Sequence, residues 1–523
     1  MTSETLVCTC LIIGGGLSAH VAAEEIAKSG GTVVLIADGA GASPYVHGIQ
    51  IPTLASDSAQ LFLRDTYEGG CRQGNYALEQ LLCEGSLGVR EQLEELGLHH
   101  NRTPDGQVEL LQPLGASCPR VVSVGNALGA FALAALKSRL AGRVRMLSGR
   151  AVRLFCKDGA FAALCYVEGK PLLIGAQTVL LAAGGFGNLY AFTTNSADMG
   201  GDALAMAYGA GAQLIDLEFV QFEPSVAVWP QAVRGKSVIT TLFYDGAALY
   251  NGRGERFMGE QEGAERVGKD VLAAAMFREI AAGRGTEHGG VYLDCTRVDA
   301  QKMRTVYHAY YERYLACGID LLKQPVEIAA GAHTTLGGVR IDGDCRTCVP
   351  GLYACGEAAG GIHGANRLGG NAGLETFVFG RRAGRSIFRA LTQGERRDAD
   401  CRGACAQAAA FLRETPFAAF DPAPVRARMR ETMSRELGVV RCGAGIARAR
   451  EEFARLRAQL PRSCAEEVLR LENDLTAADL VARCCAERTQ SIGCHIRSDC
   501  PDAGESQRYT VVAADGTIYR EAL

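Results

Sequence analysis

The chain begins with an apolar segment that gives way first to glycine and then to a helical pattern. Residues 7–16, VCTCLIIGGG, are rich in β-forming residues and end in three glycines. The next segment, LSAHVAAEEIAKSG, carries apolar residues at helical spacing and ends at a glycine. TVVLIAD then has the composition of a second buried strand. This order predicts a strand, a helix and a parallel strand at the start of an α/β domain.

The turn between the first strand and the helix carries a phosphate-binding pattern. Gly14, Gly15, Gly16, Ser18 and Ala19 belong to the run GGGLSA, which fits G-x-G-x-x-A. Such glycines admit a pyrophosphate to the helix N-terminus, and the small last residue lets the helix pack on the strand. Because the pattern lies between a predicted strand and a predicted helix, we expect it to bind a dinucleotide. The other interpretation is a glycine-rich turn in a different α/β fold.

The end of the second strand carries the acid that could bind a ribose. Asp38 follows TVVLIA directly, which is where dinucleotide-binding domains place a carboxylate for a ribose hydroxyl. A solvated turn residue is the equally plain alternative for Asp38.

Later segments indicate one sheet that is assembled from distant parts of the chain. TVLLAAGGFGNLY (178–190) and GLYACGEAAGGIHGANRLGG (351–370) are also apolar strands that run into glycines. An insertion of about 225–335 lies between them. From about 395 to 490 Arg, Glu and Ala dominate in long amphipathic patterns, and a hairpin is expected around Asp515-Gly516.

Composition narrows the class of protein. With 523 residues, 48% hydrophobic and 21% charged, the chain has the profile of a soluble globular protein of two or three domains. A formal charge of −4 gives no reason to expect a nucleic acid partner. No apolar run approaches the length of a membrane-spanning helix, and we expect no direct membrane insertion. Twenty scattered cysteines without an export signal favour reduced thiols in a cytoplasmic protein, and we predict no metal site.

Four segments together carry a family resemblance. They are LIIGGGLSA, TVLLAAGGFGNLY, VPGLYACGEAAGGIHGANRLGGNAGLETFVFGRRAG and the weaker RTQSIGCHIRSDCP. In these segments the chain resembles the flavoprotein subunits of succinate dehydrogenase and fumarate reductase, together with L-aspartate oxidase. GRGERFM and GAHTTLGGV follow the family's order between them, so the likeness covers nearly the whole chain.

The resemblance implies an α/β fold with a Rossmann-type FAD-binding domain, an inserted α+β capping domain and a C-terminal helical domain. On this basis we predict that residues 1–224 and 336–394 bind FAD and that 225–335 form the capping domain. Residues 395–500 are expected to form the helical domain, and 501–523 a C-terminal β-tail.

The same resemblance implies which residues contact FAD beyond the first turn. Residues 371–374 are expected to direct backbone N–H groups at the flavin N1/C2 edge from a helix N-terminus, which favours the anionic reduced flavin. Glu357 is expected to contact the ribitol or ribose. The further cofactor-binding residues that it implies are Ser43, Ala183, Gly184, Asp202, Asn371, Ala372 and Gly373.

The attachment of FAD is predicted to be non-covalent. Some family members attach the flavin through a His in a stretch of the form S-H-T-x-x-A-Q-G-G. The matching stretch here is GASPYVHGIQI, with Ala42 or Ser43 at or next to the His position and His47 further along.

Two residues match the family's substrate-binding positions. Arg367, in HGANRLGG, matches an Arg that grips a substrate carboxylate bidentately. His333, in GAHTTLGGV, matches a second substrate-binding residue. Structural roles, an ion pair for the Arg and a packed imidazole for the His, are the alternatives.

Other positions in the same pocket depart from the family. Glu223 stands in QFEPS where the family has a carboxylate-binding His in Q-F-H-P-T, and it would repel a carboxylate unless it is protonated or the substrate differs. Counting back from GERFM places Phe243 at the family's proton-donating Arg and Thr240 at its relay Glu, and only Asp245 preserves an acid. Both losses fall on one pocket, which indicates a changed substrate.

Four residues could replace the missing functions. Tyr244 or Tyr250 could donate a proton, although each could equally serve packing. Arg234, in AVRGKS, could supply a surrogate cation. Glu223 could anchor an amine or a hydroxyl.

These observations predict an FAD-dependent oxidoreductase that reduces an activated C=C bond, or desaturates its saturated partner, in a small carboxylate-like molecule other than fumarate. The catalytic candidates are Arg367, His333, Glu223 and Tyr244. Because the chain has no second dinucleotide pattern, electrons are expected from an iron–sulfur protein or another carrier. An aspartate-oxidase-like amino acid oxidase and an electron-transfer flavoprotein without substrate chemistry of its own are the alternatives.

Overall fold

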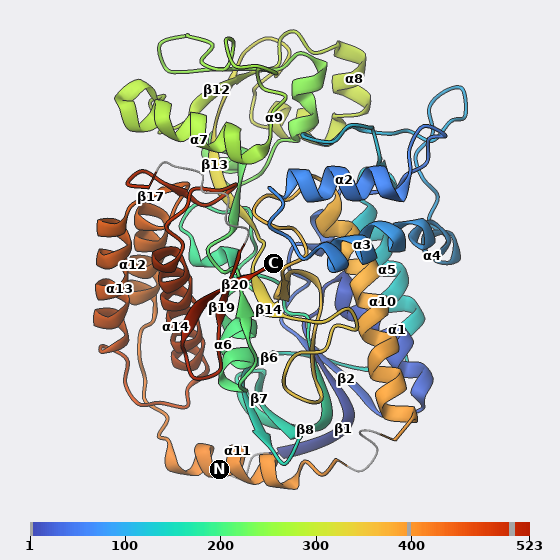
Figure 1. Ribbon diagram of the computed structural model, residues 1–523, viewed down its shortest axis with the longest axis vertical. Helices are drawn as coiled ribbons and strands as arrows, with labels where there is room; N and C mark the ends of the chain where they lie inside the picture. Colours follow the sequence, from blue (N-terminus) through green and yellow to red (C-terminus); the bar gives the residue numbers. More distant parts are fainter. Residues whose placement is uncertain (1–3, 395–398, 501–507) are drawn as a thin grey trace.

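The computed structural model describes residues 4–394, 399–500 and 508–523. Its central element is a seven-stranded sheet in the order β5-β2-β1-β8-β7-β6, with β15 also paired to β8 (Figure 1). The parallel strands are β1 (Glu4–Ile13), β2 (Val33–Ala37), β5 (Arg145–Ser148), β8 (Lys170–Leu181) and β15 (Leu352–Ala354). β6 (Arg150–Lys157) and β7 (Ala160–Val167) extend the sheet antiparallel to β8. The predicted assembly of one sheet from distant segments is therefore present.

Helices α1 (Leu17–Ile26), α5 (Leu128–Leu140) and α10 (Asn371–Thr392) cover one face of this sheet, at the right of Figure 1. α10 approaches α1 very closely because two glycines face it. A Cβ atom on Gly384 would lie 2.6 Å from the carbonyl oxygen of Ala22, and one on Gly380 would lie 2.9 Å from that of Ser18. This close packing fixes the N-termini of both helices relative to the strands that precede them.

A smaller antiparallel sheet, β10-β13-β12-β11, forms the upper part of the molecule in Figure 1. Its strands are β10 (Val220–Trp229), β11 (Ala248–Tyr250), β12 (Val291–Asp294) and β13 (Val326–Thr335). Helices α7 (Lys269–Glu279), α8 (Ala300–Thr305) and α9 (His308–Leu315) pack around it. This region, which we call the cap, has its own apolar core, with Phe243, Met276 and Tyr307 among its buried members. It corresponds to the segment predicted as an α+β insertion.

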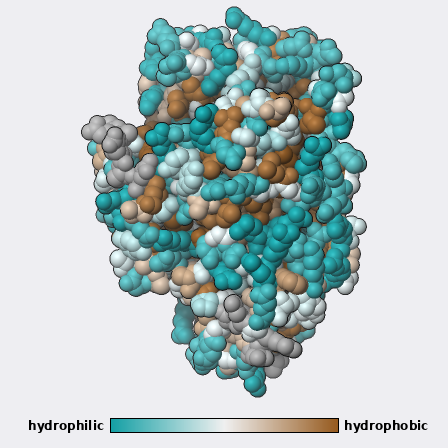
Figure 2. All heavy atoms as spheres, turned by 45° about the vertical axis from the view of Figure 1, so that its right-hand side comes forward, coloured by the Kyte–Doolittle hydropathy of each residue, from teal (hydrophilic) through white to brown (hydrophobic). Residues whose placement is uncertain are grey.

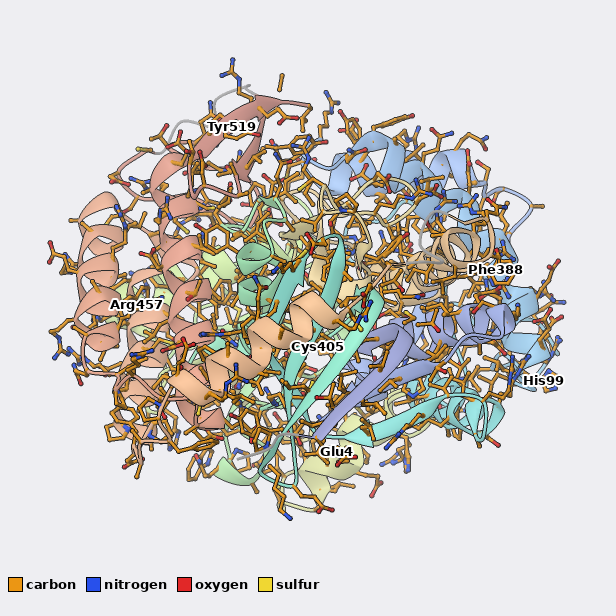
Figure 3. All side chains as sticks on the ribbon, turned by 90° about the horizontal axis from the view of Figure 1, so that it is seen from below. Glu4, His99, Phe388, Cys405, Arg457 and Tyr519 are labelled. Carbon is orange, nitrogen blue, oxygen red and sulfur yellow. The ribbon has the colours of Figure 1, made fainter. Side chains whose placement is uncertain are left out.

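Three helices at the left of Figure 1 form a bundle: α12 (Ala423–Glu436), α13 (Gly443–Arg457) and α14 (Glu466–Glu487). The first helix of the predicted helical region, α11 (Arg402–Glu414), lies elsewhere, against β6, β7 and β8. Figure 3 shows α11, marked by Cys405, crossing these strands in the view from below. Ala404 and Ala408 are fully buried there in a cluster that includes Leu164, because small residues let the helix lie close to the sheet.

The remaining elements connect these layers. The predicted hairpin around Asp515-Gly516 is present as β19 (Arg508–Val512) and β20 (Ile518–Ala522), and residues 501–507 of the predicted tail lie outside the described residues. The hairpin joins a five-stranded sheet with β9 (Leu214–Ile215), β14 (Gly338–Arg340) and β16 (Ala359–Gly360). The other elements are α2 (Ala59–Gly69), α3 (Tyr76–Gly85), α4 (Val89–Glu95), α6 (Asp202–Gly209), β3 (Gly48–Gln50), β4 (Val121–Ser123), β17 (Val440–Arg441) and β18 (Ile496–Arg497).

The surface is mostly hydrophilic, but hydrophobic side chains gather across the upper half of the face shown in Figure 2. Within the described part of the chain, no helix combines the length and the apolar character that crossing a bilayer requires.

Candidate active site

A cavity opens where β1 ends and α1 begins, and it continues past the end of β8 to the start of α10. Most of the residues predicted to bind the cofactor line it: Gly14, Gly15, Gly16, Ser18, Asp38, Ser43, Ala183, Gly184, Asp202, Glu357 and Ala372. Segments more than 350 residues apart in sequence thus meet around one cavity.

Three of the predicted cofactor residues do not line this cavity. Ala19 is fully buried in the core. The side chain of Asn371 accepts a hydrogen bond from Gln50 at 2.9 Å and donates one to Thr66 at 3.2 Å. Gly373 lies against Val46 and Ile49, where a Cβ atom would come within 2.7 Å of the Val46 side chain. These three residues pack behind the residues that line the cavity.

Two acids in the cavity are joined by an arginine that the sequence analysis did not identify. Arg150 donates to Asp202 at 3.0 Å and to Asp38 at 3.1 Å. Asn473 donates to the other oxygen of Asp202 at 2.7 Å. Asp202 is therefore fully engaged by the protein, whereas the Asp38 side chain remains 54% exposed and free to accept a further hydroxyl donor.

The cavity suits a long molecule with a diphosphate in its middle. The N-termini of α1 and α10 both face it, and neither helix has an acid in its first turn, so each presents the positive end of a helix dipole. Ser43 accepts a hydrogen bond from the Leu17 N–H at 2.8 Å and so fixes the glycine turn. Glu357 accepts a hydrogen bond from the N–H of Thr335 at 2.9 Å and lines the cavity. These features fit a dinucleotide cofactor.

Beside the α10 end of the cavity, four charged or ionisable side chains meet where the cap rests on the main domain. We call Glu223, Lys269, His333 and Arg367 the charged cluster. They come from β10, the first residue of α7, β13 and the loop before α10. The sequence analysis predicted three of them; Lys269 is new.

Glu223 and Lys269 form a buried ion pair. The Lys269 ammonium donates to Glu223 Oε2, and the Ser225 hydroxyl donates to Oε1 at 3.0 Å. Their side chains are 5% and 10% exposed, respectively. Burial raises the pKa of Glu223, but the charge of the Lys269 ammonium and the hydrogen bonds from Lys269 and Ser225 hold the pKa below its ordinary value. Glu223 is therefore an anion.

Lys269 is a stronger acid than an ordinary lysine. Burial lowers its pKa, the nearby Arg367 lowers it further, and Glu223 partly opposes both effects. Its place at the first position of α7 also disfavours a cation, because this end of a helix carries a partial positive charge.

His333 is a neutral imidazole. Its Nε2 lies 3.8 Å from Glu223 Oε2, and its Nδ1 lies 2.7 Å from the Thr194 hydroxyl oxygen. Burial lowers its pKa to about 3, with Lys269 and Arg367 adding to the effect and Glu223 opposing it. The side chain is 28% exposed, so it still faces open space.

Arg367 is buried without a carboxylate partner among the described residues. It donates to the Leu368 carbonyl at 3.3 Å and to the Thr334 hydroxyl at 3.3 Å, and its Nε has no partner there. Gln221 holds the loop by donating to the Arg367 carbonyl at 2.9 Å. A buried guanidinium with an unpaired donor is costly unless an anion satisfies it.

Comparisons with known proteins agree with this geometry. Residues 9–372 match the model of an FAD binding domain, and residues 426–518 match that of the fumarate reductase flavoprotein C-terminal region. One subunit of the fumarate reductase (CoM/CoB) of Methanothermobacter marburgensis is 33% identical, with 96% of each chain covered. An L-aspartate oxidase of Caulobacter vibrioides is 32% identical over 97% of this chain and 96% of its own. A chain of the quinol fumarate reductase of E. coli superposes with a TM-score of 0.88 at 25% identity, covering 99% of this chain and 97% of that one.

The chain belongs to the succinate dehydrogenase and fumarate reductase flavoprotein family. It is an FAD-dependent oxidoreductase, and the predicted fold class and cofactor are confirmed.

Three residues that the sequence analysis offered as replacements lie apart from the charged cluster of this flavoprotein. Tyr244 lies at the edge of the cap core, its hydroxyl near Gly115, and burial raises its pKa. Arg234 donates to the Val228 carbonyl at 3.2 Å and stacks over Phe192. Tyr250 pairs with Tyr292 across β11 and β12. Among the described residues, none of the three makes a hydrogen bond or ion pair with the cluster.

Phe243 and Thr240, which were predicted to replace the family's Arg and Glu, and the nearby Asp245 have structural roles in the cap. Phe243 is buried in the apolar core of the cap. Asp245 accepts hydrogen bonds from Tyr307 and Lys302, both at 2.6 Å, and so ties the 3-10 turn of residues 240–245 to α8 and to the start of α9. Thr240 is buried.

Lys269 could have been found from the sequence only by an indirect signal. An acid in an apolar strand such as VQFEPSVAV needs a buried cation, and the chain has only eight lysines. Nothing in the 45 residues between Glu223 and Lys269 indicates which lysine it is.

Proposed function

We propose that this flavoprotein interconverts a C=C bond and a CH–CH bond in a small molecule with a single carboxylate, and that fumarate is not its natural substrate. The observation that supports this is the charge of the cluster. Glu223 is an anion, His333 is neutral, and Lys269 and Arg367 are cations, so the cluster carries one net positive charge. A monocarboxylate neutralises it, whereas a dicarboxylate would leave an excess negative charge in a buried site.

Arg367 binds the substrate carboxylate in this proposal. Its unpaired Nε and its terminal nitrogens offer the planar pair of donors that matches a carboxylate. Thr334 and the Leu368 carbonyl hold the guanidinium in place. His333, oriented by Thr194, donates or accepts one further hydrogen bond at the same end of the substrate.

Bound FAD supplies the transfer of two electrons and a hydrogen nucleus at its N5 position. The protein's part is to hold the substrate carbon against that position and to exclude water. The cap serves the second purpose, since His47 of the main domain and Tyr310 of α9 have ring centroids 6.5 Å apart across the junction.

The resemblance to L-aspartate oxidases supports a second candidate, oxidation of an amino acid. In that reaction Glu223 would hold the substrate ammonium group. Lys269 already occupies Glu223 Oε2, so the first candidate accounts for more of the site.

We also propose that electrons arrive through a carrier protein, such as an iron–sulfur protein. The sequence has a single dinucleotide-binding pattern, and that pattern lines the cavity that we assign to FAD. No second pattern is left for a nicotinamide cofactor. The hydrophobic side chains gathered on the face in Figure 2 offer a surface for such a partner.

The experiment is anaerobic reoxidation of the dye-reduced protein. Fumarate, crotonate and cinnamate are added separately while the flavin absorbance is followed. We expect rapid reoxidation by at least one monocarboxylate and slow reoxidation by fumarate. Rapid reoxidation by fumarate would refute the proposal that fumarate is not the natural substrate. Reoxidation by no unsaturated acid, with turnover of an amino acid under oxygen, would favour the second candidate.

A further inference from the structure

We propose that His363 and Glu375 form a buried pair that takes up one proton when the bound flavin is reduced, and that the charge of this pair tunes the reduction potential of the flavin. The pair acts on the cofactor, so its role does not depend on which substrate the protein takes. Neither residue belongs to the charged cluster.

The pair joins the loop before α10 to α10 itself. His363 Nε2 lies 2.8 Å from Glu375 Oε2, and the side chains are 5% and 3% exposed, respectively. The other two polar atoms, His363 Nδ1 and Glu375 Oε1, have no hydrogen-bond partner in the part of the chain that the structure describes. A buried pair that only fastens the fold is expected to use all of its polar atoms. An imidazole with a free Nδ1 beside a carboxylate can instead gain or lose a proton.

Glu375 lies at the α10 end of the cofactor cavity. Ala372 and Thr376, one turn apart on α10, both line the cavity, and Glu375 directly precedes the second of them. Its charge is felt by two groups of the site. Burial raises the pKa of Glu357 to about 7, and Glu375 adds to the effect. Burial lowers the pKa of Arg367, and Glu375 is among the acids that oppose it.

The N-terminus of α10 makes the charge of the pair matter to the cofactor. The first backbone N–H groups of a helix carry a partial positive charge, which favours the negative charge that reduction adds. Glu375 stands only four residues after Asn371, the first residue of α10, and its carboxylate opposes that field. An imidazolium at His363 cancels the opposition, because the charged pair has no net charge.

Protons and electrons balance in the proposed step. A dye or a carrier protein delivers two electrons, and solvent delivers two protons. The electrons and one proton go to the cofactor, which leaves one added negative charge there. In the neutral imidazole the proton lies on Nε2, since the carboxylate can only accept. The second proton therefore binds the lone pair of His363 Nδ1, and reoxidation releases it again.

Four other titratable groups face the pair from the elements around it, and two of them compete for the proton. Arg367 keeps its charge, and Cys355 keeps its proton because burial raises its pKa to about 12. Glu357 and Glu79, near the loop on α3, have their pKa raised by burial to about 7 and about 8, respectively. A carboxylic acid and an imidazole are distinguished by following His363 directly.

The test measures the potential of the flavin, which a purely structural pair would not link to pH. Midpoint potentials of the holoprotein are determined by anaerobic equilibration with dyes from pH 6 to 9 for the wild type, Glu375→Gln and His363→Gln. The control is Glu312→Gln, in the exposed His308–Glu312 pair of α9. In parallel, ¹³C-histidine NMR follows His363 in the oxidised and reduced wild type. The His363 signal is assigned by its loss in His363→Gln, among nine histidines.

We expect the wild-type potential to fall by about 60 mV per pH unit over part of this range. Each proton taken up with two electrons contributes about 30 mV per tenfold change in proton concentration. Glu375→Gln and His363→Gln should fall by about 30 mV per pH unit throughout, and Glu312→Gln should match the wild type. Near pH 9 Glu375→Gln should have the higher potential, because its side chain carries no negative charge. The NMR titration of His363 should move to higher pH when the flavin is reduced.

Three results would overturn the role. The first is a wild-type slope of about 30 mV per pH unit at every pH, and the second is a His363 titration at the same pH in both redox states. The third is a steep slope that survives in Glu375→Gln, which would assign the proton to Glu357 or Glu79. If Glu375→Gln does not bind FAD, the wild-type NMR titrations in the two redox states decide the question alone.

Discussion

Lys269 donates a hydrogen bond to Glu223 across the cap, and both side chains are buried. Buried ion pairs contribute little net stability, but the loss of one partner is expensive because the other charge stays uncompensated. We expect Lys269→Met to destabilise the protein by about 3–5 kcal/mol. The double variant Lys269→Met/Glu223→Gln should lose less than Lys269→Met alone, because no isolated carboxylate remains.

Thermal midpoints of the two single variants and the double variant provide this measurement, with hydrogen exchange of α7 as a local readout. Losses that simply add in the double variant would show that the two side chains do not stabilise each other.

Arg367 is predicted to be the carboxylate anchor, and lysine cannot replace it. Lysine offers a point charge where the site holds a planar pair of donors. We expect Arg367→Lys to weaken binding of a monocarboxylate to the oxidised protein by about 10–100-fold, the range of a lost hydrogen bond to a charged group. Flavin difference spectra at increasing ligand concentration measure this. Arg455→Lys, at an exposed pair with Glu452 on α13, should bind as the wild type does. Equal affinity of Arg367→Lys would indicate a structural arginine.

FAD is predicted to be held without a covalent bond. Ser43, at or next to the position of the linking His in some relatives, lines the cavity and accepts the Leu17 N–H. His47 is partly buried further along the same segment, and burial lowers its pKa to about 4. Acid precipitation should therefore release all the yellow colour into the supernatant as FAD, and the intact mass of the polypeptide should equal that of its sequence. Flavin that stays with the pellet would disprove this.

The sequence predicted best what is local and worst what depends on contacts across the fold. The glycine turn at Gly14–Gly16 is specified by adjacent residues, and so is the hairpin at Asp515-Gly516, and both are present. Lys269 and Arg150 were not predicted because their roles depend on partners that are distant in sequence. Glu223 is 46 positions from Lys269, and Asp202 and Asp38 are 52 and 112 positions from Arg150. The sequence showed that Glu223 replaces the family's His, but its role could not be inferred without its partner Lys269.

The position of α11 illustrates the same limit. It lies within the predicted helical domain of residues 395–500, but the composition behind that prediction does not indicate which surface this helix covers. Ala404 and Ala408 fit against β6–β8 because alanine allows the helix to approach the sheet, and that complementarity exists only once the sheet has formed.

Glu79 predicts a pH dependence of stability that lies outside the charged cluster. It is fully buried on α3, and neither carboxyl oxygen has a hydrogen-bond partner among the described residues. Burial raises its pKa to about 8. In the unfolded chain the group ionises near its ordinary value of 4.5. Between these values the folded protein binds more protons than the unfolded chain, so stability falls as pH rises.

Glu79→Gln cannot ionise, and this variant should lose that slope. We expect it to match the wild type near pH 5 and to exceed it by roughly 3–5 kcal/mol near pH 9, since each unit of pKa shift corresponds to about 1.4 kcal/mol. Thermal midpoints at pH 5, 7 and 9 measure the difference, and Glu84→Gln, exposed on the same helix, is the matched control. Equal differences between Glu79→Gln and the wild type at all three values would mean that Glu79 stays ionised in the folded protein. A Cβ atom on Gly74 would lie 2.0 Å from Glu79 Oε1 and 3.1 Å from the Gly364 nitrogen, so a permanent carboxylate there would put a negative charge beside the loop that leads to Arg367. Carboxylate binding would then show no dependence on pH between 5 and 9 that is due to Glu79.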